Sequence, residues 1–146
     1  MIRIFSLLPA LALLACADGA AERNTDAAPT APVKRYRGAI SNGMKGDSLF
    51  FEISPDGRQL RNLTFKGYWR CSGRLEQTTV GPEGSFAVVG GKAKGHLAEP
   101  PGGGSTAWRF EIDASISRTT AAGTFRMNIN NLGCDTYLLK WTATTY

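Results

Sequence analysis

Strict alternation of apolar and polar side chains between residues 108 and 116 is the feature that most narrows the folds open to this chain. The apolar positions are Trp108, Phe110, Ile112, Ala114 and Ile116, and the polar positions between them are Arg109, Glu111, Asp113 and Ser115. Successive side chains of a β-strand point to opposite faces, so the pattern predicts a strand with one buried and one solvated face. No stretch of the domain shows the 3.6-residue period of an amphipathic helix, and an all-β fold is therefore expected.

Alternation punctuated by glycine, asparagine and proline continues from residue 35 to the end of the sequence. The predicted strands cover residues 36–40, 48–54, 59–71, 74–80, 84–89, 94–97, 108–116 and 125–129, with a break at 121–123 and a last strand through 137–143. Gly67, in the middle of the long third strand, predicts a bulge or a sharp bend. The last strand is expected to turn Tyr137, Leu139 and Trp141 to one face.

The N-terminal residues have the pattern of an export signal. One positive charge precedes an apolar run at 4–15, which is too short to cross a bilayer as a mature helix. Ala15 directly before Cys16 resembles the lipobox of bacterial lipoproteins, in which the cysteine thiol receives a diacylglycerol and becomes residue one after cleavage. An ordinary secretory signal cleaved near Ala20 or Ala21 is the alternative. Either signal directs the rest of the chain out of the cytoplasm.

The segment after the lipobox has the composition of a linker. Residues 17–33 contain a single large apolar side chain, Val33, and cannot bury enough surface to offset the entropy of ordering, so a flexible tether is expected. The predicted organisation is a lipoprotein signal peptide at 1–15, the lipidated cysteine and tether at 16–33, and one β-domain at 34–146.

The cysteines predict one disulfide. The lipobox assigns Cys16 to lipid, which leaves Cys71 and Cys134 as a pair in an oxidising space. Residue 134 has the opposite parity from the apolar residues of the last strand, so a bulge near Asp135 or Thr136 is expected. A single histidine and the lack of a Cys-x-x-Cys spacing argue against a metal site, and no metal or other cofactor is predicted.

Two architectures fit about eight to ten antiparallel strands connected mostly by hairpins. They are an antiparallel β-sandwich and a closed up-and-down β-barrel. The strands are uneven in length, and a disulfide from an early-middle strand to the last one suits two facing sheets. These two features favour the β-sandwich.

The formal net charge of the chain is +5, and its lysines and arginines are spread along the strands. No dense block of like charge is present, so nucleic acid is not an expected partner. A basic domain held at a membrane is attracted to anionic lipid headgroups or acidic polysaccharide. A solvated surface that maintains solubility is the simpler explanation of the same charge.

Several short motifs occur at core, turn and cysteine positions of the domain. They are Tyr36-x-Gly38, the Phe-x-Ile-Ser-x-Asp-Gly run at 51–57, Leu63-x-Phe65 before Cys71, Gly123-Thr124-Phe125, and Cys134 with Trp141-Thr142-Ala143. Together they resemble a recurring extracytoplasmic module of bacterial secreted proteins and lipoproteins. They occupy core, turn and disulfide positions, so the resemblance implies the fold and no activity. Asp135-Thr136 departs from the module, where a Ser-Gly pair often follows the second cysteine.

No catalytic residue is predicted. His96 is the sole histidine, and no Gly-x-Ser-x-Gly sequence supplies a nucleophile for it. Glu111 and Asp113 share a strand face with Arg109, so solvated ion pairs explain these carboxylates better than a glycosidase pair does.

Two surfaces are predicted to make binding contacts. Aromatic and arginine side chains of outward parity on a sheet face stack on sugar rings or on a partner protein; the candidates are Tyr36, Phe50, Tyr68, Arg70 and Arg109. The alternative for Tyr68 and Arg70 is a place in the second layer of a sandwich. The loop at 98–106 is the second surface, with Gly102, Gly103 and Gly104 at its tip.

The expected function is that of a lipid-anchored, non-catalytic protein of the cell envelope that binds an envelope protein or a polysaccharide. Ala17 and Asp18 after the lipid cysteine favour delivery to the outer membrane, facing the periplasm, over retention at the inner membrane, and a secreted protein is the alternative. A lipoprotein inhibitor that inserts the 100–105 loop into a lysozyme or protease is the alternative, although basic lysozymes would be repelled. An envelope hydrolase ranks last, because it requires His96 or a carboxylate pair in a cleft.

Overall fold

The computed structural model describes residues 31–146. The predicted signal peptide, the lipidation site Cys16 and the predicted tether up to residue 30 lie outside the described residues. Within the described part, strands joined by turns make up the chain, with one 3-10 turn at Asn130–Leu132. This part contains no helical segment with the length and apolar character needed to cross a membrane.

Most strands follow the sequence pattern. The strands are β1 (Lys34–Ile40), β2 (Ser48–Ile53), β3 (Gln59–Cys71), β4 (Arg74–Val80), β5 (Phe86–Val89), β6 (Lys92–Glu99), β7 (Trp108–Ile116), β8 (Thr120–Ile129), β9 (Cys134–Asp135) and β10 (Leu139–Thr145). Every pairing between them is antiparallel. However, β8 begins at Thr120 and not at the predicted residue 125, and the short β9 was not predicted.

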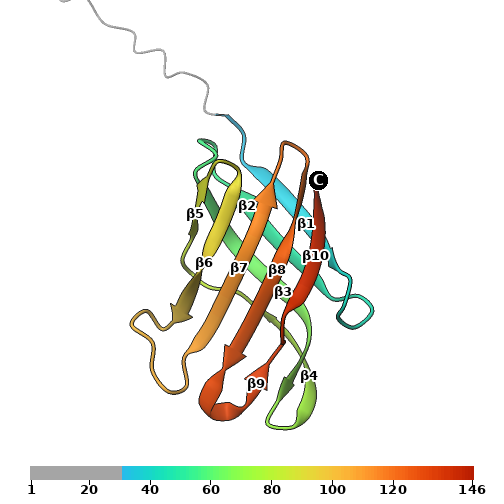
Figure 1. The fold of residues 1–146 in the computed structure, drawn as a ribbon, viewed down its shortest axis with the longest axis vertical. Helices are drawn as coiled ribbons and strands as arrows, with labels where there is room; N and C mark the ends of the chain where they lie inside the picture. Colours follow the sequence, from blue (N-terminus) through green and yellow to red (C-terminus); the bar gives the residue numbers. More distant parts are fainter. Residues whose placement is uncertain (1–30) are drawn as a thin grey trace, which may run out of the picture.

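The strands pair in a ring that runs β1–β2–β3–β5–β6–β7–β8–β10 and returns to β1. In Figure 1, β5 to β8 and β10 lie in front of β1 to β3, and the two layers cross at an angle. The layers enclose a single core, so the predicted all-β, sandwich-like antiparallel fold is confirmed. Two strands lie off the ring: β4 pairs with β3 alone, and the short β9 pairs with β8 and β3.

Large aromatic side chains fill the core. The rings of Tyr36 and Phe51 stack with their centroids 4.9 Å apart, and Trp141 meets the edge of Phe51 at 5.6 Å. Trp69 and Trp108 stack at 4.9 Å near the end of the core where β9 lies. The alternation in β1, β2, β3, β7 and β10 therefore has a direct cause, because every second side chain enters this one core.

The disulfide between Cys71 and Cys134 is confirmed and joins the end of β3 to β9. The side chains change parity after residue 134 because the strand is interrupted between β9 and β10, and not because of the predicted bulge. The chain leaves the sheet at 136–138, where Tyr137 has a φ of 56°, and re-enters it as β10. Tyr137 was expected on the core face, but its side chain is 62% exposed because it lies in this break.

Two further expectations about glycines were wrong for a common reason. Residues 121–123 lie inside β8, and the turn before it is at 117–119. β3 pairs with β4 without a register shift through Gly67, and the irregularity of β3 lies instead opposite Phe50 and Glu52. A Cβ on Gly123 would lie 2.0 Å from the Asp113 carbonyl oxygen, and one on Gly67 would lie 2.7 Å from the Asp47 carboxylate. Both glycines permit close approach within continuous strands.

The domain has two ends with different contents. β1 begins at one end, here called the proximal end, together with the turns at 54–58, 90–91 and 117–119 (Figure 1). β4 and β9 lie at the opposite, distal end, with the loops at 41–47 and 136–138 close by (Figure 1).

Candidate functional site

One of the predicted surface residues, Tyr36, belongs to the core. Its side chain is 1% exposed, and its hydroxyl donates a hydrogen bond to the Ser117 carbonyl oxygen at 2.9 Å. Burial raises the pKa of this phenol. The outward parity expected for Tyr36 was wrong because β1 turns Arg35 and Arg37 to solvent and Tyr36 and Gly38 to the core. Tyr36 is therefore removed from the binding surface.

Arg70 and Arg109, which are far apart in the sequence, lie in one row across the outer face of the sheet. β9 creates this row, because Asp135 pairs with Arg70 of β3 on one side and with Asn128 of β8 on the other, and Asn128 pairs with Arg109 of β7. Leu75 of β4 continues the row beyond Arg70. The prediction that Arg70 and Arg109 share a face is therefore correct, although two residues separate them.

At the centre of the row, some polar atoms have hydrogen-bond partners in residues 31–146 and others have none. Arg126 donates two hydrogen bonds to the Asp135 carboxylate, from Nη2 at 2.6 Å and from Nε at 3.1 Å. These bonds raise the pKa of the Arg126 guanidinium. Asn128 Oδ1 and Arg109 Nη1 are buried and have no hydrogen-bond partner among the described residues. The row thus combines a satisfied ion pair with two polar atoms that a hydrogen-bonding partner would stabilise.

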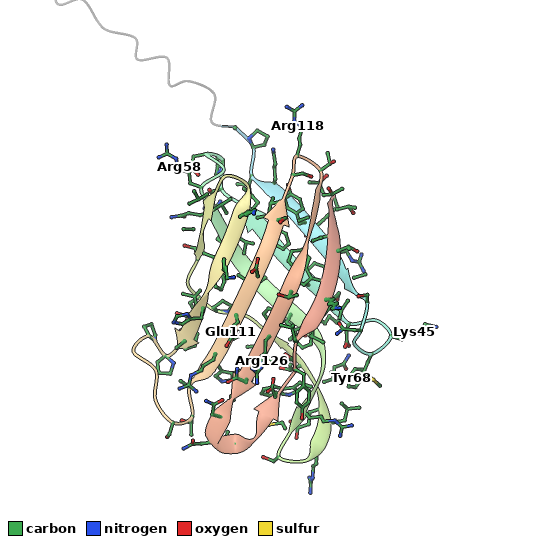
Figure 2. All side chains as sticks on the ribbon, viewed as in Figure 1. Lys45, Arg58, Tyr68, Glu111, Arg118 and Arg126 are labelled. Atoms are coloured by element: carbon green, nitrogen blue, oxygen red, sulfur yellow. A yellow bond between two sulfur atoms is a disulfide. The ribbon has the colours of Figure 1, made fainter. Side chains whose placement is uncertain are left out.

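Beside this row, exposed apolar side chains surround a groove of about 350 Å³. We call it the distal groove and define it by Met44, Tyr68, Arg70, Leu75 and Tyr137. The exposed fractions are 48% for Met44 and Leu75, 37% for Tyr68 and 62% for Tyr137. Figure 2 shows Tyr68 in the half of the molecule that also carries Glu111 and Arg126, away from Arg58 and Arg118. Large apolar side chains grouped in this way are typical of binding surfaces.

Asp47 fixes the loop that forms one wall of the groove. Its side chain is 4% exposed, and its carboxylate accepts hydrogen bonds from the backbone N–H groups of Met44 at 2.7 Å and Tyr68 at 3.0 Å. This buried carboxylate ties the 41–47 loop directly to β3. The absence of a side chain on Gly67 is what allows Asp47 to lie there.

The opposite wall is tied to the same loop by Asn42. The Asn42 side-chain amide donates to the Leu138 carbonyl oxygen at 2.9 Å, and its oxygen accepts from the Lys140 N–H at 2.6 Å. Asp135 also accepts a hydrogen bond from the Tyr137 N–H at 2.7 Å. The backbone positions of Met44, Tyr68 and Tyr137 are therefore fixed by hydrogen bonds that their N–H groups donate to the buried Asp47 and the half-buried Asp135.

The glycine loop forms a separate surface. Gly102, Gly103 and Gly104 have φ values of 91°, 78° and 138°, in the region that favours glycine. Gly102 and Gly103 line a hollow of about 700 Å³ with Arg109 and Glu99 on its other side. Arg109 thus contacts this hollow, whereas Tyr68 and Arg70 line the distal groove. The two predicted surfaces therefore line different hollows, which share no lining residue.

His96 lies at a small hollow of about 280 Å³ that Lys94, Glu111, Asp113 and Thr124 also line. This side chain is exposed on β6, opposite Glu111 of β7. Lys94 and Asp113 form an exposed ion pair nearby at 3.0 Å. Among residues 31–146, no group of three or more His, Cys, Asp or Glu side chains is placed to bind a metal ion.

Sequence reasoning missed Met44, Leu75 and Tyr137 as members of the groove. Tyr137 was expected on the core face of the last strand, and no role was predicted for Leu75 or Met44. Leu75 and Tyr137 are exposed because β4 lies outside the ring and because the chain breaks between β9 and β10. The one available signal was the parity change after Cys134, which required an irregularity at this point.

Comparisons of the chain with protein-family models, with curated proteins and with solved structures gave no match.

Proposed function

We propose that this protein is a lipid-anchored, non-catalytic protein of the bacterial cell envelope whose β-domain binds a partner protein through the distal groove. One observation carries the proposal: four large apolar side chains, Met44, Tyr68, Leu75 and Tyr137, are exposed around a single groove. Tyrosine, methionine and arginine are the residue types enriched in protein interfaces.

The charge around the groove defines the partner further. Arg70 lies in the groove, and Lys45 and Arg74 are exposed close to it. The carboxylates at the groove are already engaged, Asp135 by Arg126 and Asp47 by two backbone N–H groups. A partner segment with an apolar side chain next to a carboxylate therefore complements the groove, since the apolar group enters it and the carboxylate pairs with Arg70.

The rigidity of the groove favours binding. Asp47, Asn42 and the Cys71–Cys134 disulfide fix its walls before any partner arrives. Little conformational entropy is then lost on association, which strengthens binding for a given contact area.

The position of the groove fits presentation from an anchor. β1 begins at the proximal end, whereas the groove lies near β4 and β9 at the distal end (Figure 1). A lipid on Cys16 would place the bilayer on the side of the proximal end and leave the groove accessible to a partner.

Photo-crosslinking in cells tests this proposal. A photoreactive amino acid replaces Leu75 in the groove of the full chain, and a matched control carries it at the exposed Thr142 of β10. We expect one discrete crosslinked protein from position 75 and none from position 142. Adding Arg70→Glu is expected to reduce the yield at position 75 by tenfold or more, because it reverses the charge beside the groove.

Two results contradict the proposal. One is the same set of products from positions 75 and 142, which shows contact without selectivity. The other is a product from position 75 whose yield does not change with Arg70→Glu or Tyr137→Ala. The lipid anchor is tested separately by the mass of the mature N-terminal residue, where a diacylglycerol on Cys16 is expected.

A further inference from the structure

The proximal end of the domain is strongly cationic. Its positive side chains lie on β1, on the 54–58 turn, at the start of β6 and on the 117–119 turn, and they are Lys34, Arg35, Arg37, Arg58, Lys92 and Arg118. Figure 2 shows Arg58 and Arg118 projecting from this end. Among the described residues, the acidic side chains in contact with these basic residues are Glu52 and Asp56.

The two carboxylates leave most of this positive charge uncompensated. Glu52 pairs with Arg35 at 3.1 Å and lies 3.7 Å from Arg61. Asp56 accepts the backbone N–H of Arg58 at 3.1 Å within its own turn. No salt bridge in residues 31–146 involves Arg58, Lys92 or Arg118. The proximal end therefore presents a positive electrostatic potential to the solvent.

Backbone hydrogen bonds join the turns of this end into one platform. The Ile116 N–H donates to the Gly91 carbonyl oxygen at 2.7 Å, and the Thr145 N–H donates to the Thr119 carbonyl oxygen at 3.0 Å. The Tyr146 N–H donates to the Arg35 carbonyl oxygen at 3.2 Å. Because these bonds fix the turns relative to one another, the cations that they carry act together on one flat partner.

Apolar side chains project among the cations. Val89 is 77% exposed at the β5–β6 turn, and Tyr146 is 73% exposed beside the start of β1. A tyrosine and a small apolar group next to lysines and arginines are typical of protein surfaces that contact the headgroup region of a membrane.

A hollow of about 790 Å³ opens at the side of the same end, between Arg37 and Lys92. Ser117, Thr120 and Thr144 line it, and the Ser117 hydroxyl donates a hydrogen bond to the Thr120 carbonyl oxygen at 2.9 Å. Two cations, together with the hydroxyl group of Thr144, are the groups that bind phosphate oxygens. The hollow has the chemistry needed to receive the phosphodiester of a lipid headgroup.

The chain itself directs this end toward a membrane. The described residues begin beside Lys34 at the proximal end (Figure 1), and the stretch from Cys16 to Lys34 spans at most about 60 Å even when fully extended. An anchor at Cys16 would hold the cationic end at high effective concentration near the bilayer.

We propose that the proximal end docks on the surface of an anionic phospholipid bilayer and so orients the distal groove away from the membrane. The docking surface consists of Arg58, Arg118, Lys92 and Arg37, with Val89 and Tyr146 entering the headgroup region. The orientation rests on the proposed lipid anchor, whereas the affinity of the cationic end for anionic lipid does not.

Vesicle binding of the full chain with Cys16→Ser, which carries no lipid, tests the surface. Vesicles of phosphatidylcholine alone are compared with vesicles that also contain phosphatidylglycerol. Preferential binding to the anionic vesicles is expected, and raising the salt from about 0.05 M to about 0.3 M is expected to abolish the preference. Arg58→Glu with Arg118→Glu should lower partitioning into anionic vesicles about thirtyfold or more, since each cation near the surface contributes about fivefold.

The matched control reverses two cations at the distal end, Lys45→Glu with Arg74→Glu, and changes the net charge of the chain equally. Its partitioning is expected to fall far less than that of the proximal variant. Equal losses in the two variants would show that net charge alone drives binding and would overturn the proposal. Equal binding to neutral and anionic vesicles would overturn it as well, because the predicted N-terminal apolar run then accounts for the binding.

The vesicle experiment can fail or succeed independently of the crosslinking experiment that tests the proposed function. The proximal variant is expected to retain the crosslink from position 75, because Arg58 and Arg118 lie far from the groove (Figure 2). Loss of vesicle binding with an intact crosslink supports both proposals, and intact vesicle binding in the proximal variant overturns only the docking surface.

Discussion

The two ends of this domain are ordered by different kinds of interaction. At the distal end, side chains provide the connections: the Cys71–Cys134 disulfide joins β3 to β9, the Asp47 carboxylate holds the 41–47 loop, and Trp69 stacks on Trp108. At the proximal end, short turns are joined mainly by backbone hydrogen bonds between neighbouring strands.

The difference follows from the regularity of the strand pairing. The ring is continuous through β7, β8, β10 and β1, so the paired strands fix the positions of the turns at the proximal end. At the distal end β4 lies outside the ring, and the chain is interrupted at 136–138 between β9 and β10. Hydrogen bonds between strands alone therefore cannot fix the loops at 41–47 and 136–138. The same irregularity exposes Leu75 and Tyr137, which explains why the apolar groove lies at the end that depends on side-chain connections.

Removal of the disulfide is the strongest test of this comparison. The double substitution Cys71→Ala with Cys134→Ala is expected to lower the free energy of unfolding by about 4 kcal/mol, from the loop of 63 residues that the bond closes. Urea denaturation of the oxidised protein and of the variant measures the difference. Hydrogen exchange should accelerate first at the distal end, and faster exchange confined to the proximal turns would contradict the comparison.

Loss of the Asp47 carboxylate is expected to have the next largest effect. Asp47→Ala leaves the Met44 and Tyr68 N–H groups without their acceptor and should cost about 2 kcal/mol of stability. The Tyr68 amide should exchange faster, whereas the amides of Ile116 and Thr145 keep their protection. Asp47→Asn is the matched control, since it retains one carbonyl oxygen and should lose about half as much. An equal loss of protection at both ends would show that the loop is not held locally.

The smallest expected effect concerns the proximal end, where the ion pair of Glu52 with Arg35 should make stability depend on pH. Hydrogen bonding from Arg35 holds the pKa of Glu52 below its ordinary value of 4.5. The stabilisation by ionised Glu52 is therefore complete above about pH 4.5 and is lost as the pH falls through the lower pKa of the folded state.

The Glu52→Gln variant removes this dependence. The difference in unfolding free energy between wild type and variant is expected to be below about 1 kcal/mol, because the pair is partly exposed, and to shrink as the solution becomes more acidic than pH 4.5. Thermal unfolding across this range measures it. Asp113→Asn, which breaks the more exposed pair with Lys94, is the control and should change stability very little. If the difference in unfolding free energy between wild type and Glu52→Gln grew as the pH fell, ionised Glu52 would not be the stabilising form.

Local patterns predicted the secondary structure well. The boundaries of β3, β4 and β7 follow from alternation and from turn residues, and the pairing of Cys71 with Cys134 follows from the count of cysteines. The errors occurred at glycines, at Tyr36 and at Tyr137, where a break in the sheet replaces the predicted bulge. Gly67 and Gly123 have the appearance of strand breakers, but they are required where another group approaches the backbone, and no local pattern contains that information.

The candidate site was predicted in part. Tyr68 and Arg70 were identified from outward parity in a long strand, and both line the groove. Tyr36 was assigned to the wrong face, because parity gives two faces and only the partner strands decide which of them is buried. Met44 was not identified, since its place in the groove depends on a carboxylate that binds both its own loop and β3.

The sequence by itself determined the all-β class, the antiparallel strands, the disulfide and the excess of positive charge. These features depend on side-chain period, turn residues and composition, which are properties of short stretches of chain. Only the tertiary structure decided that β9 would bring Arg70 and Arg109 into one row, that β4 would lie outside the ring, and that the cations of four separate segments would share one end. Strand order and closure set these placements, and they arise from contacts between residues far apart in the sequence, which no local pattern encodes.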